Sequence, residues 1–292
     1  MGQWILTGQS TQAELVDQSL LYGIVLLSAV GHASWNALLK RTTDRLVMMV
    51  AIRIVGLIYG FVLLWIVGAP SIESLKWLIA AAVTMWLYQV LLIQSYRAGD
   101  LSFVYPLARG LAPVLSTGLA FLLIGESISL VQLSGVICIS LGIFSLVVLG
   151  YGGNLALIYA TLIGASVAVY SLLSGAGVRL SGNLFGFSAA LEIASGVGFL
   201  AYAAVKGARS IAASMLAIWP TCMVAGMLSV VGYLTFLVAA TYLPIGPVSA
   251  IRECSALFGV LIGVFVLKEP FGTTRAMGAL LMTAGIIVLA AT

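Results

Sequence analysis

Two arginines lie deep inside apolar runs of this sequence. Arg109 is the only charged residue in "YPLARGLAPVLSTGLAFLL", and Arg252 lies in "VSAIRECSALFGVLIGVFVL". A guanidinium group is a planar fork of donors that fits a carboxylate, and a charge this deep in a membrane should face a bundle interior or a wet cavity. We expect at least one of the two arginines to bind a substrate carboxylate. The alternative is that both hold helices together through backbone carbonyls or acidic side chains.

Two glutamates are candidates for coupling transport to a proton gradient. Glu192 lies at the same depth of its run as Arg53 does in an earlier run, with the opposite charge. Buried carboxylates of this kind carry protons in pumps and transporters. The alternative for Glu192 is a structural ion pair with an arginine. Glu253, the second candidate, is adjacent to Arg252, so it should point about 100° round the helix and not share its face.

Polar and aromatic side chains recur at helical spacing in other apolar runs. His32, Trp35 and Asn36 form one such stripe, with the alternative of a packing role. Aromatic and hydrogen-bonding groups around a cavity suit an amphipathic organic solute. The expected substrate-binding residues are His32, Trp35, Asn36, Trp86, Tyr88, Gln89, Arg109, Tyr170, Tyr233 and Arg252.

The elements that position these residues are long apolar segments. The chain has 292 residues, of which 62% are hydrophobic and 8% charged, and its mean hydropathy is +1.18. A soluble domain has about 25% charged residues, so the composition indicates an all-α integral membrane protein. We expect ten transmembrane helices near 20–39, 46–67, 75–96, 101–123, 130–149, 154–174, 184–205, 212–241, 245–267 and 272–291, after an extramembrane segment 1–19. Pro220 should interrupt the eighth, and Pro106 and Pro113 should break the fourth.

The chain repeats itself at an offset of 143 positions. The matched pairs are Arg109 and Arg252, Glu126 and Glu269, Gly135 and Gly278, and Gly142 and Gly285. The two halves, 20–149 and 154–291, would each hold five helices. Because five is odd, the second half should be inverted relative to the first. Inverted repeats around a midplane site are typical of secondary transporters that work by alternating access. We expect a central cavity lined by the first, third, fourth, sixth, eighth and ninth helices.

The repeated segments "FLLIGESISLVQLSG" and "GVFVLKEPFGTTRAMG" resemble EamA domains of the drug/metabolite transporter superfamily. "GHASWNALLKR" is similar to the first helix of one EamA branch. The resemblance covers nearly the whole chain and is nearest to amino-acid exporters of the YddG type. It implies ten helices in two EamA repeats and export of small metabolites, most of all amino acids, across a bacterial inner membrane.

Charge placement predicts the orientation, because Lys and Arg favour cytoplasmic loops. One side collects Lys40, Arg41, Arg45, Arg97, Lys206, Arg209, Lys268 and Arg275, whereas the other collects Lys76 and Arg179. The loop after the first helix should therefore be cytoplasmic and both termini outside.

The other function classes are a passive channel or uniporter for small solutes and an intramembrane enzyme. No H-E-x-x-H, G-x-S-x-G or Walker A motif is present, so we expect no enzyme activity and no cofactor. The three cysteines lack metal or disulfide spacing, so we expect no metal site either. The few basic residues sit mostly beside helix ends, which argues against nucleic acid as a partner. The expected partners are a small-molecule substrate and the lipid bilayer, and the oligomeric state stays open.

Overall fold

The structure is a computed structural model that describes residues 17–42, 44–98, 101–147, 153–205, 214–215, 217–265 and 272–292. Every regular element in those ranges is helical. The elements are α3 (Gln18–Arg41), α4 (Arg45–Val67), the 3₁₀ turn η1 (Ile72–Ser74), α5 (Leu75–Ala98), α6 (Leu101–Ile124), α7 (Leu130–Phe144), α8 (Asn154–Leu180), α9 (Leu184–Val205), α11 (Trp219–Tyr242), α12 (Ile245–Glu253), α13 (Ser255–Phe265) and α14 (Thr273–Ala290).

Nine stretches of the described residues are long and apolar enough to cross a membrane, with α12 and the start of α13 forming one of them. The remaining predicted segment, 130–149, corresponds to α7, which is apolar but has only 15 residues. It ends at Phe144, where Ser145 donates its backbone N–H to Leu141. Positions 1–16 of the expected extramembrane segment 1–19 lie outside the described residues. The last two positions of this segment already belong to α3, which begins at Gln18.

One expectation about helix continuity was confirmed and two were wrong. The eighth segment is interrupted next to Pro220: helical residues 214, 215 and 217 precede a turn at Ile218, and α11 begins at Trp219 with Pro220 in its first turn. Pro106 and Pro113 do not break α6, which continues through both. The ninth segment is not one helix, because α12 and α13 are separated by a turn at Cys254, whose backbone N–H bonds to the carbonyl of Ile251.

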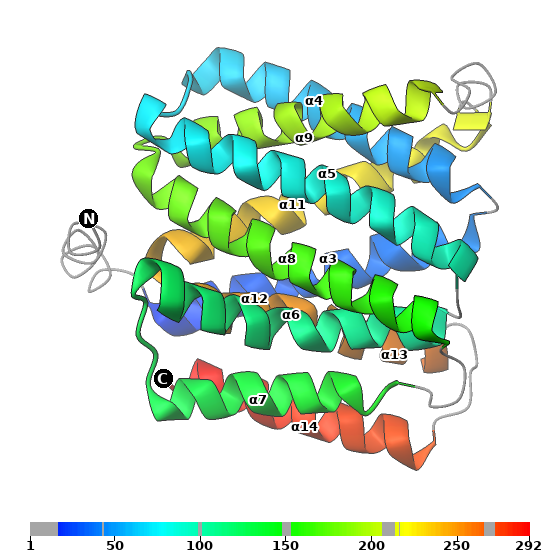
Figure 1. Cartoon of the computed structure of the whole chain (residues 1–292), viewed down its shortest axis with the longest axis vertical. Coiled ribbons are helices and arrows are strands. Elements are labelled where there is room, and N and C mark those ends of the chain that lie inside the picture. Colours follow the sequence, from blue (N-terminus) through cyan, green and yellow to red (C-terminus); the bar gives the residue numbers. More distant parts are fainter. Residues whose placement is uncertain are drawn as a thin grey trace.

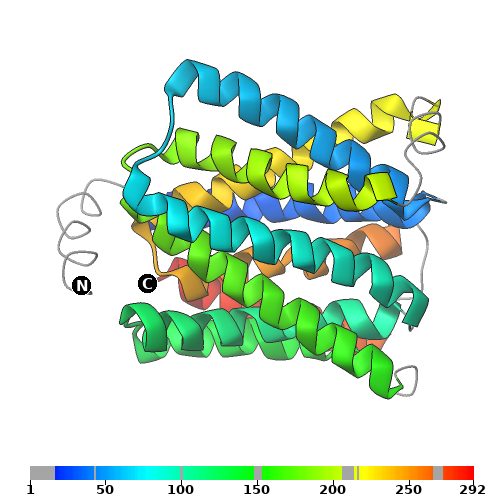
Figure 2. The same ribbon diagram turned by 45° about the horizontal axis from the view of Figure 1, so that its top comes forward.

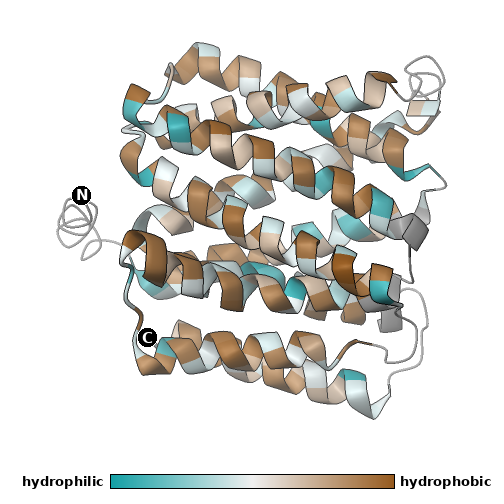
Figure 3. Ribbon diagram, in the orientation of Figure 1, coloured by the Kyte–Doolittle hydropathy of each residue, from teal (hydrophilic) through white to brown (hydrophobic). Residues whose placement is uncertain are grey.

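The outer face of the bundle is apolar. Large hydrophobic side chains are exposed along several helices, among them Trp65 at 89%, Leu130 at 84% and Leu122 at 74%. Figure 3 shows hydrophobic residues along the helices, with hydrophilic positions gathered mainly at their ends. An exposed apolar surface of this extent needs lipid around it, because soluble monomers keep such patches small.

The helices lie side by side and cross the bundle in the same general direction (Figures 1 and 2). The most extensive contacts join α5 with α8, α7 with α14, α6 with α8, α4 with α9, and α3 with α11. Each of these pairs combines a helix of residues 20–149 with a helix of residues 154–291. The two sequence halves are therefore intimately packed and do not form separate bodies.

Glycines allow a close helix approach between α7 and α14. A Cβ added to Gly142 would lie 2.8 Å from the carbonyl oxygen of Gly278, and one added to Gly285 would lie 2.7 Å from that of Gly135. Backbone atoms cannot move aside as a flexible side chain can, so only glycine fits at these contacts.

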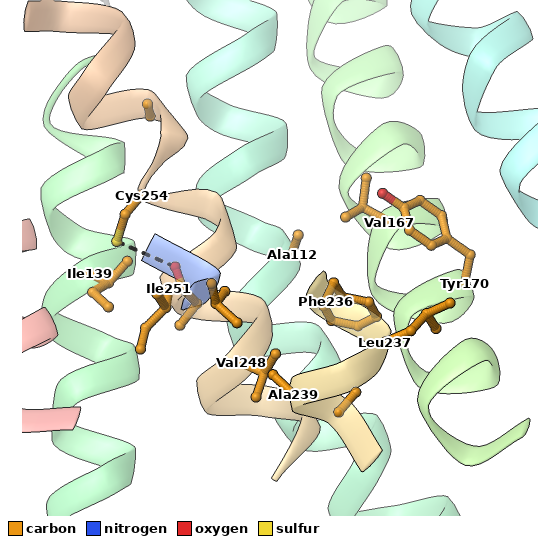
Figure 4. Packing of buried hydrophobic residues seen from close by; sticks show 14 of the residues in the cluster. Ala112, Ile139, Val167, Tyr170, Phe236, Leu237, Ala239, Val248, Ile251 and Cys254 are labelled. Atoms are coloured by element: carbon orange, nitrogen blue, oxygen red, sulfur yellow. Dashed lines mark hydrogen bonds between the residues drawn. The ribbon is translucent and has the colours of Figure 1, made fainter. Parts of the chain in front are cut away.

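One part of the buried core is built from aliphatic and aromatic side chains of α6, α7, α8, α11 and α12 (Figure 4). Phe236 and Cys254 are fully buried there, and the Cys254 thiol donates to the carbonyl of Ala250 at 3.4 Å. Cys138, Cys222 and Cys254 are all free thiols.

The beginning of α3 and the end of α14 lie at the same end of the bundle (Figure 1, left). The connections 68–71, 125–129, 181–183 and 243–244 lie there too, and we call this the short-loop end. The connection from α3 to α4, at positions 42–44, lies at the opposite end.

Candidate functional site

A polar cavity lies inside the bundle between the two sequence halves. It encloses about 590 Å³ of space free of protein atoms, a figure that includes its open mouth. Helices α3, α4, α5, α8, α9, α11 and α12 form its wall. The lining residues are His32, Trp35, Met49, Ile52, Arg53, Met85, Tyr88, Gln89, Tyr170, Glu192, Ser229, Gly232, Tyr233 and Arg252.

Most of the residues selected from the sequence lie on this wall, namely His32, Trp35, Tyr88, Gln89, Tyr170, Glu192, Tyr233 and Arg252. The expected set of helices was partly wrong. The second and seventh helices, α4 and α9, also line the cavity, whereas the fourth, α6, contributes no lining residue. The reason is that Arg53 and Glu192 come from facing helices and meet beside the cavity, while Arg109 of α6 lies behind its wall.

Two selected residues point elsewhere. Met85, Tyr88 and Gln89 follow helical spacing on the cavity side of α5, which turns Trp86 away toward α9 and Gly198. Asn36 bonds to its own helix, because its amide donates to the carbonyl of His32 at 2.7 Å.

Arg109 and Arg252 share the carboxylate of Glu253. Arg109 Nη1 pairs with Glu253 Oε2, while Arg252 Nε and Nη2 donate to Oε1 at 3.3 and 3.1 Å. Arg252 Nη2 also donates to the hydroxyl of Ser171 at 3.0 Å. Both arginine side chains are 3% exposed and that of Glu253 is fully buried.

The expectation that Glu253 would not meet Arg252 was therefore wrong. Glu253 is the last residue of α12, and the chain turns at Cys254 directly after it. The arginine stem is long enough to bring its guanidinium round to that carboxylate. Arg109 thus makes the ion pair of the alternative interpretation, whereas Arg252 faces the cavity and its Nη1 is buried without a hydrogen-bond partner.

Aromatic rings surround the guanidinium of Arg252. Its Cζ lies 4.4 Å from the centre of the Phe236 ring, 5.5 Å from that of Tyr170 and 6.0 Å from that of Tyr233. Tyr170 also packs against Tyr88, with ring centres 5.7 Å apart. A cation is stabilised by aromatic faces at these distances, and the same faces offer apolar contact area to a solute.

His32 links the charged cluster to the cavity wall. Its Nε2 lies 2.6 Å from Arg109 Nη2, and its Nδ1 lies 3.3 Å from the indole nitrogen of Trp35. Arg109 Nη2 and the indole N–H of Trp35 both direct a donor at the imidazole ring. A neutral imidazole has one acceptor nitrogen, so the two donors compete for it.

Arg53 and Glu192 form a second buried ion pair, between α4 and α9. Arg53 Nη1 lies 3.0 Å from Glu192 Oε2, and Arg53 Nη2 donates to Ser229 at 3.3 Å. A Cβ added to Gly56 would lie 2.5 Å from the same carboxylate oxygen. The geometry of Glu192 is thus that of the structural ion pair left open as its alternative role.

A third polar cluster joins several elements at the short-loop end. Arg179 Nη2 lies 2.8 Å from Glu126 Oε1, and Arg179 also donates to the carbonyls of Ala240 and Leu243 at 2.8 Å. Glu126 Oε2 accepts the backbone N–H of Ile245 at 2.8 Å, so it caps the start of α12. We call these five residues the end network. They connect the ends of α6, α8 and α11 to α12.

Sequence reasoning matched Glu126 with Glu269 across the repeat but did not identify its partner. Arg179 entered only as a charge for orientation, because its backbone acceptors are more than 60 positions away and leave no local pattern. Glu269, the repeat partner of Glu126, lies outside the described residues.

Backbone contacts close the same end further. Ser71 donates its hydroxyl to the carbonyl of Leu180 at 2.7 Å and its N–H to that of Ser181 at 2.9 Å. Asn183 donates to the carbonyl of Val67 at 2.8 Å. These bonds tie the loop after α4 to the loop after α8, so the two sequence halves are joined at the short-loop end.

The chain is an all-helical, multi-pass membrane protein with a polar cavity inside its bundle. No family model and no curated protein matches the sequence. Solved structures do match, 28 chains in all. One, described only as a crystal structure of a protein, superposes with a TM-score of 0.69 over 93% of this chain and 95% of its own, at 13% sequence identity. At that identity the likeness concerns the fold alone.

Proposed function

We propose that this protein is a secondary transporter that exports small organic metabolites, most of all amino acids, across the bacterial inner membrane. The observation that carries the proposal is the cavity, whose wall combines ionised, hydrogen-bonding and aromatic groups inside an otherwise apolar bundle. Ionisable groups are costly at such depth and mark substrate pathways in membrane proteins. Both sequence halves contribute to the wall, as expected for a site between two repeats.

The contact between α7 and α14 supports an inverted relation of the halves. Gly135 faces Gly285, and Gly142 faces Gly278, so the two helices run antiparallel. At the offset of 143 positions Gly135 corresponds to Gly278, and Gly142 to Gly285. Exchanging the halves therefore turns each contact into the other. A two-fold axis between the helices produces this reciprocity.

Helix pairing elsewhere follows the same rule. If α3 to α7 correspond to α8, α9, α11, α12–α13 and α14, the pair α5 and α8 becomes α11 and α3, and both pairs pack closely. The pair α6 and α8 becomes α12–α13 and α3, which also pack together. Ten crossings in two inverted halves of five account for this pattern.

Alternating access requires one end of the cavity to close while the other opens. The short-loop end is closed by the end network, whereas lining residues approach the opposite end at Met49, four positions into α4. Among the described residues, Arg45 in the first turn of α4 and Arg275 in the first turn of α14 lie at that opposite end, which the positive-inside rule assigns to the cytoplasm. In this orientation the site is loaded from the cytoplasm, and release requires the end network to open.

Flux into liposomes tests the proposal. The purified chain should give saturable uptake of one or more amino acids from a panel, and preloaded unlabelled solute should accelerate exchange. Gly232 lines the cavity, and a Cβ there would lie 3.7 Å from the nearest neighbour, so Gly232→Phe should fold and fill the cavity. Gly118→Phe is the matched control, because Gly118 lies in α6 with no atom within 4 Å of an added Cβ.

The outcomes separate the function classes. Saturable exchange that Gly232→Phe abolishes and Gly118→Phe retains supports the transporter. Flux that neither saturates nor exchanges would make the protein a channel. A chemically altered solute after incubation would make it an enzyme, and repeating the uptake with and without a pH gradient tests proton coupling.

A further inference from the structure

We infer that the cavity takes a net monoanion, a small organic carboxylate with no ammonium group of its own to balance it. This inference rests on the proposed transport of small organic metabolites, but within that class it favours simple carboxylates over amino acids. It starts from a charge count. The charged side chains that line or adjoin the cavity are Arg53, Arg109, Glu192, Arg252 and Glu253.

Three guanidinium groups in this set face two carboxylates. Arg53 and Glu192 neutralise each other as one pair. Glu253 is shared by Arg109 and Arg252, which leaves one positive charge in excess. His32 cannot carry a further charge while its Nε2 accepts from Arg109. An uncompensated charge in a site shielded from water costs several kcal/mol by general estimates, so the site gains from an added negative charge.

The excess charge has an unoccupied donor on the cavity wall. Arg252 is 3% exposed, and its Nη1 has no hydrogen-bond partner. The indole N–H of Trp35 is a second donor on the same wall, because it competes with Arg109 for the single acceptor nitrogen of His32. A carboxylate has two oxygens and accepts from two such donors. Gln89 adds a third polar group, since its buried Oε1 also lacks a partner and would accept a hydroxyl from the cargo.

A zwitterion satisfies this site less well than an anion. Its carboxylate would meet Arg252, but its ammonium group would restore the excess positive charge. Both oxygens of Glu253 are already engaged, so the ammonium would have to approach Glu192, whose charge Arg53 already neutralises through Oε2. The rings of Tyr170 and Tyr233 beside Arg252 favour an apolar or aromatic body next to the carboxylate.

Net charge also determines the energetics of transport. An anion leaving a cell whose interior is negative moves down the membrane potential, so its export needs no coupling ion. A zwitterion feels no such force. The inference therefore makes Glu192 a structural partner of Arg53, with no proton to carry during the cycle.

Three compounds with the same benzene ring and similar length separate the possibilities: 3-phenylpropionate as the anion, phenylalanine as the zwitterion and phenethylamine as the cation. Binding is measured as the rise in Tm of the full-length chain in detergent, in a slightly alkaline medium that keeps the acid ionised. The anion should raise Tm at concentrations at least tenfold lower than phenylalanine needs, and the cation should have no effect.

Arg252→Gln removes the excess charge and should weaken anion binding at least tenfold, and it should weaken phenylalanine binding by a smaller factor. Lys76→Gln is the matched control, because it makes the same change in charge at an exposed position at the start of α5. In liposomes, an inside-positive potassium diffusion potential should increase uptake of the anion, and reversing the potential should suppress it.

Failure of this inference is distinguishable from failure of the proposed function. Tm shifts and saturable flux that favour phenylalanine, with no effect of potential, would overturn the monoanion and leave a transporter. If Arg252→Gln abolishes anion binding but no compound shows flux, the monoanion site stands and the proposed transport function is wrong. The measurements on the unaltered chain decide the question even if Arg252→Gln fails to fold.

Discussion

The ion pair between Arg53 and Glu192 gives a prediction that separates a structural role from proton coupling. The two side chains are 6% and 3% exposed, and their charged atoms lie 3.0 Å apart. We predict that Arg53→Gln and Glu192→Gln each destabilise the protein and that the double variant recovers most of the loss. A carboxylate that exists to carry protons would not need its arginine in this way.

The magnitude follows from the geometry. With an effective dielectric constant of about 20, two charges at 3.0 Å attract by roughly 5–6 kcal/mol, and desolvation offsets part of this. Breaking a buried pair by removing one partner costs about 3–5 kcal/mol, because the other charge stays buried. Arg53 also bonds Ser229, whereas Arg53 is the only partner found for Glu192 in the described residues. The loss in Arg53→Gln should therefore exceed that in Glu192→Gln by about 1 kcal/mol.

The assay is a double-mutant cycle on the free energy of unfolding in mixed detergent micelles. The double variant places two amides opposite each other and should lose less than about 2 kcal/mol. Because the two single losses sum to about 6–10 kcal/mol, the coupling energy should be at least about 4 kcal/mol. The same four proteins are compared for flux with and without a pH gradient. Glu192→Gln should leave the response to the gradient unchanged.

Additive losses would refute this reasoning. If the double variant loses the sum of the two single losses within about 0.5 kcal/mol, the residues are not coupled and the ion pair contributes nothing. A response to the pH gradient that disappears in Glu192→Gln but persists in Arg53→Gln would instead identify Glu192 as a proton carrier.

Other contacts give predictions of the same kind. Gly142→Ala should lower the free energy of unfolding by about 1–3 kcal/mol, since its Cβ would lie 2.8 Å from the carbonyl oxygen of Gly278. Gly118→Ala, where an added Cβ meets nothing, should be neutral or stabilising by up to about 1 kcal/mol, and equal losses in the two variants would contradict the close contact. Arg179→Gln should cost about 3 kcal/mol and accelerate amide hydrogen exchange at the start of α12, because it releases the Glu126 carboxylate that caps this helix. Unchanged exchange there would show that the end network does not hold the short-loop end closed.

Periodicity predicted part of the candidate site. A helical repeat fixes which positions share a face whatever the neighbours are, so His32 and Trp35 were placed together from their spacing, whereas Tyr88 and Gln89 were selected by residue type. The same rule excludes Trp86, which was selected for its residue type and against its register. Helix existence was equally predictable, because a long apolar run has few other stable forms in lipid.

Contacts made at the ends of helices could not be predicted from the sequence. The carboxylate of Glu253 pairs with Arg252 because α12 ends at Glu253. The turn that follows at Cys254 contains no proline or glycine from which it could have been predicted. Arg179 bonds backbone carbonyls of α11 that any residue types would supply. Such partners depend on the packing of distant helices, which local patterns do not encode.

The buried charges differ in one respect that bears on function. A polar network that serves only to fix helix packing gains most when every donor has its acceptor, because an unpaired buried group costs as much as a hydrogen bond yields. Arg109 follows this rule through Glu253 and His32. Arg252 does not, since its Nη1 remains unpaired on the cavity wall although the same glutamate already holds the rest of the group. A cargo that supplies an acceptor to this Nη1 recovers the cost of leaving it unpaired. Substitution of Arg252 should therefore weaken cargo binding more than it weakens helix packing.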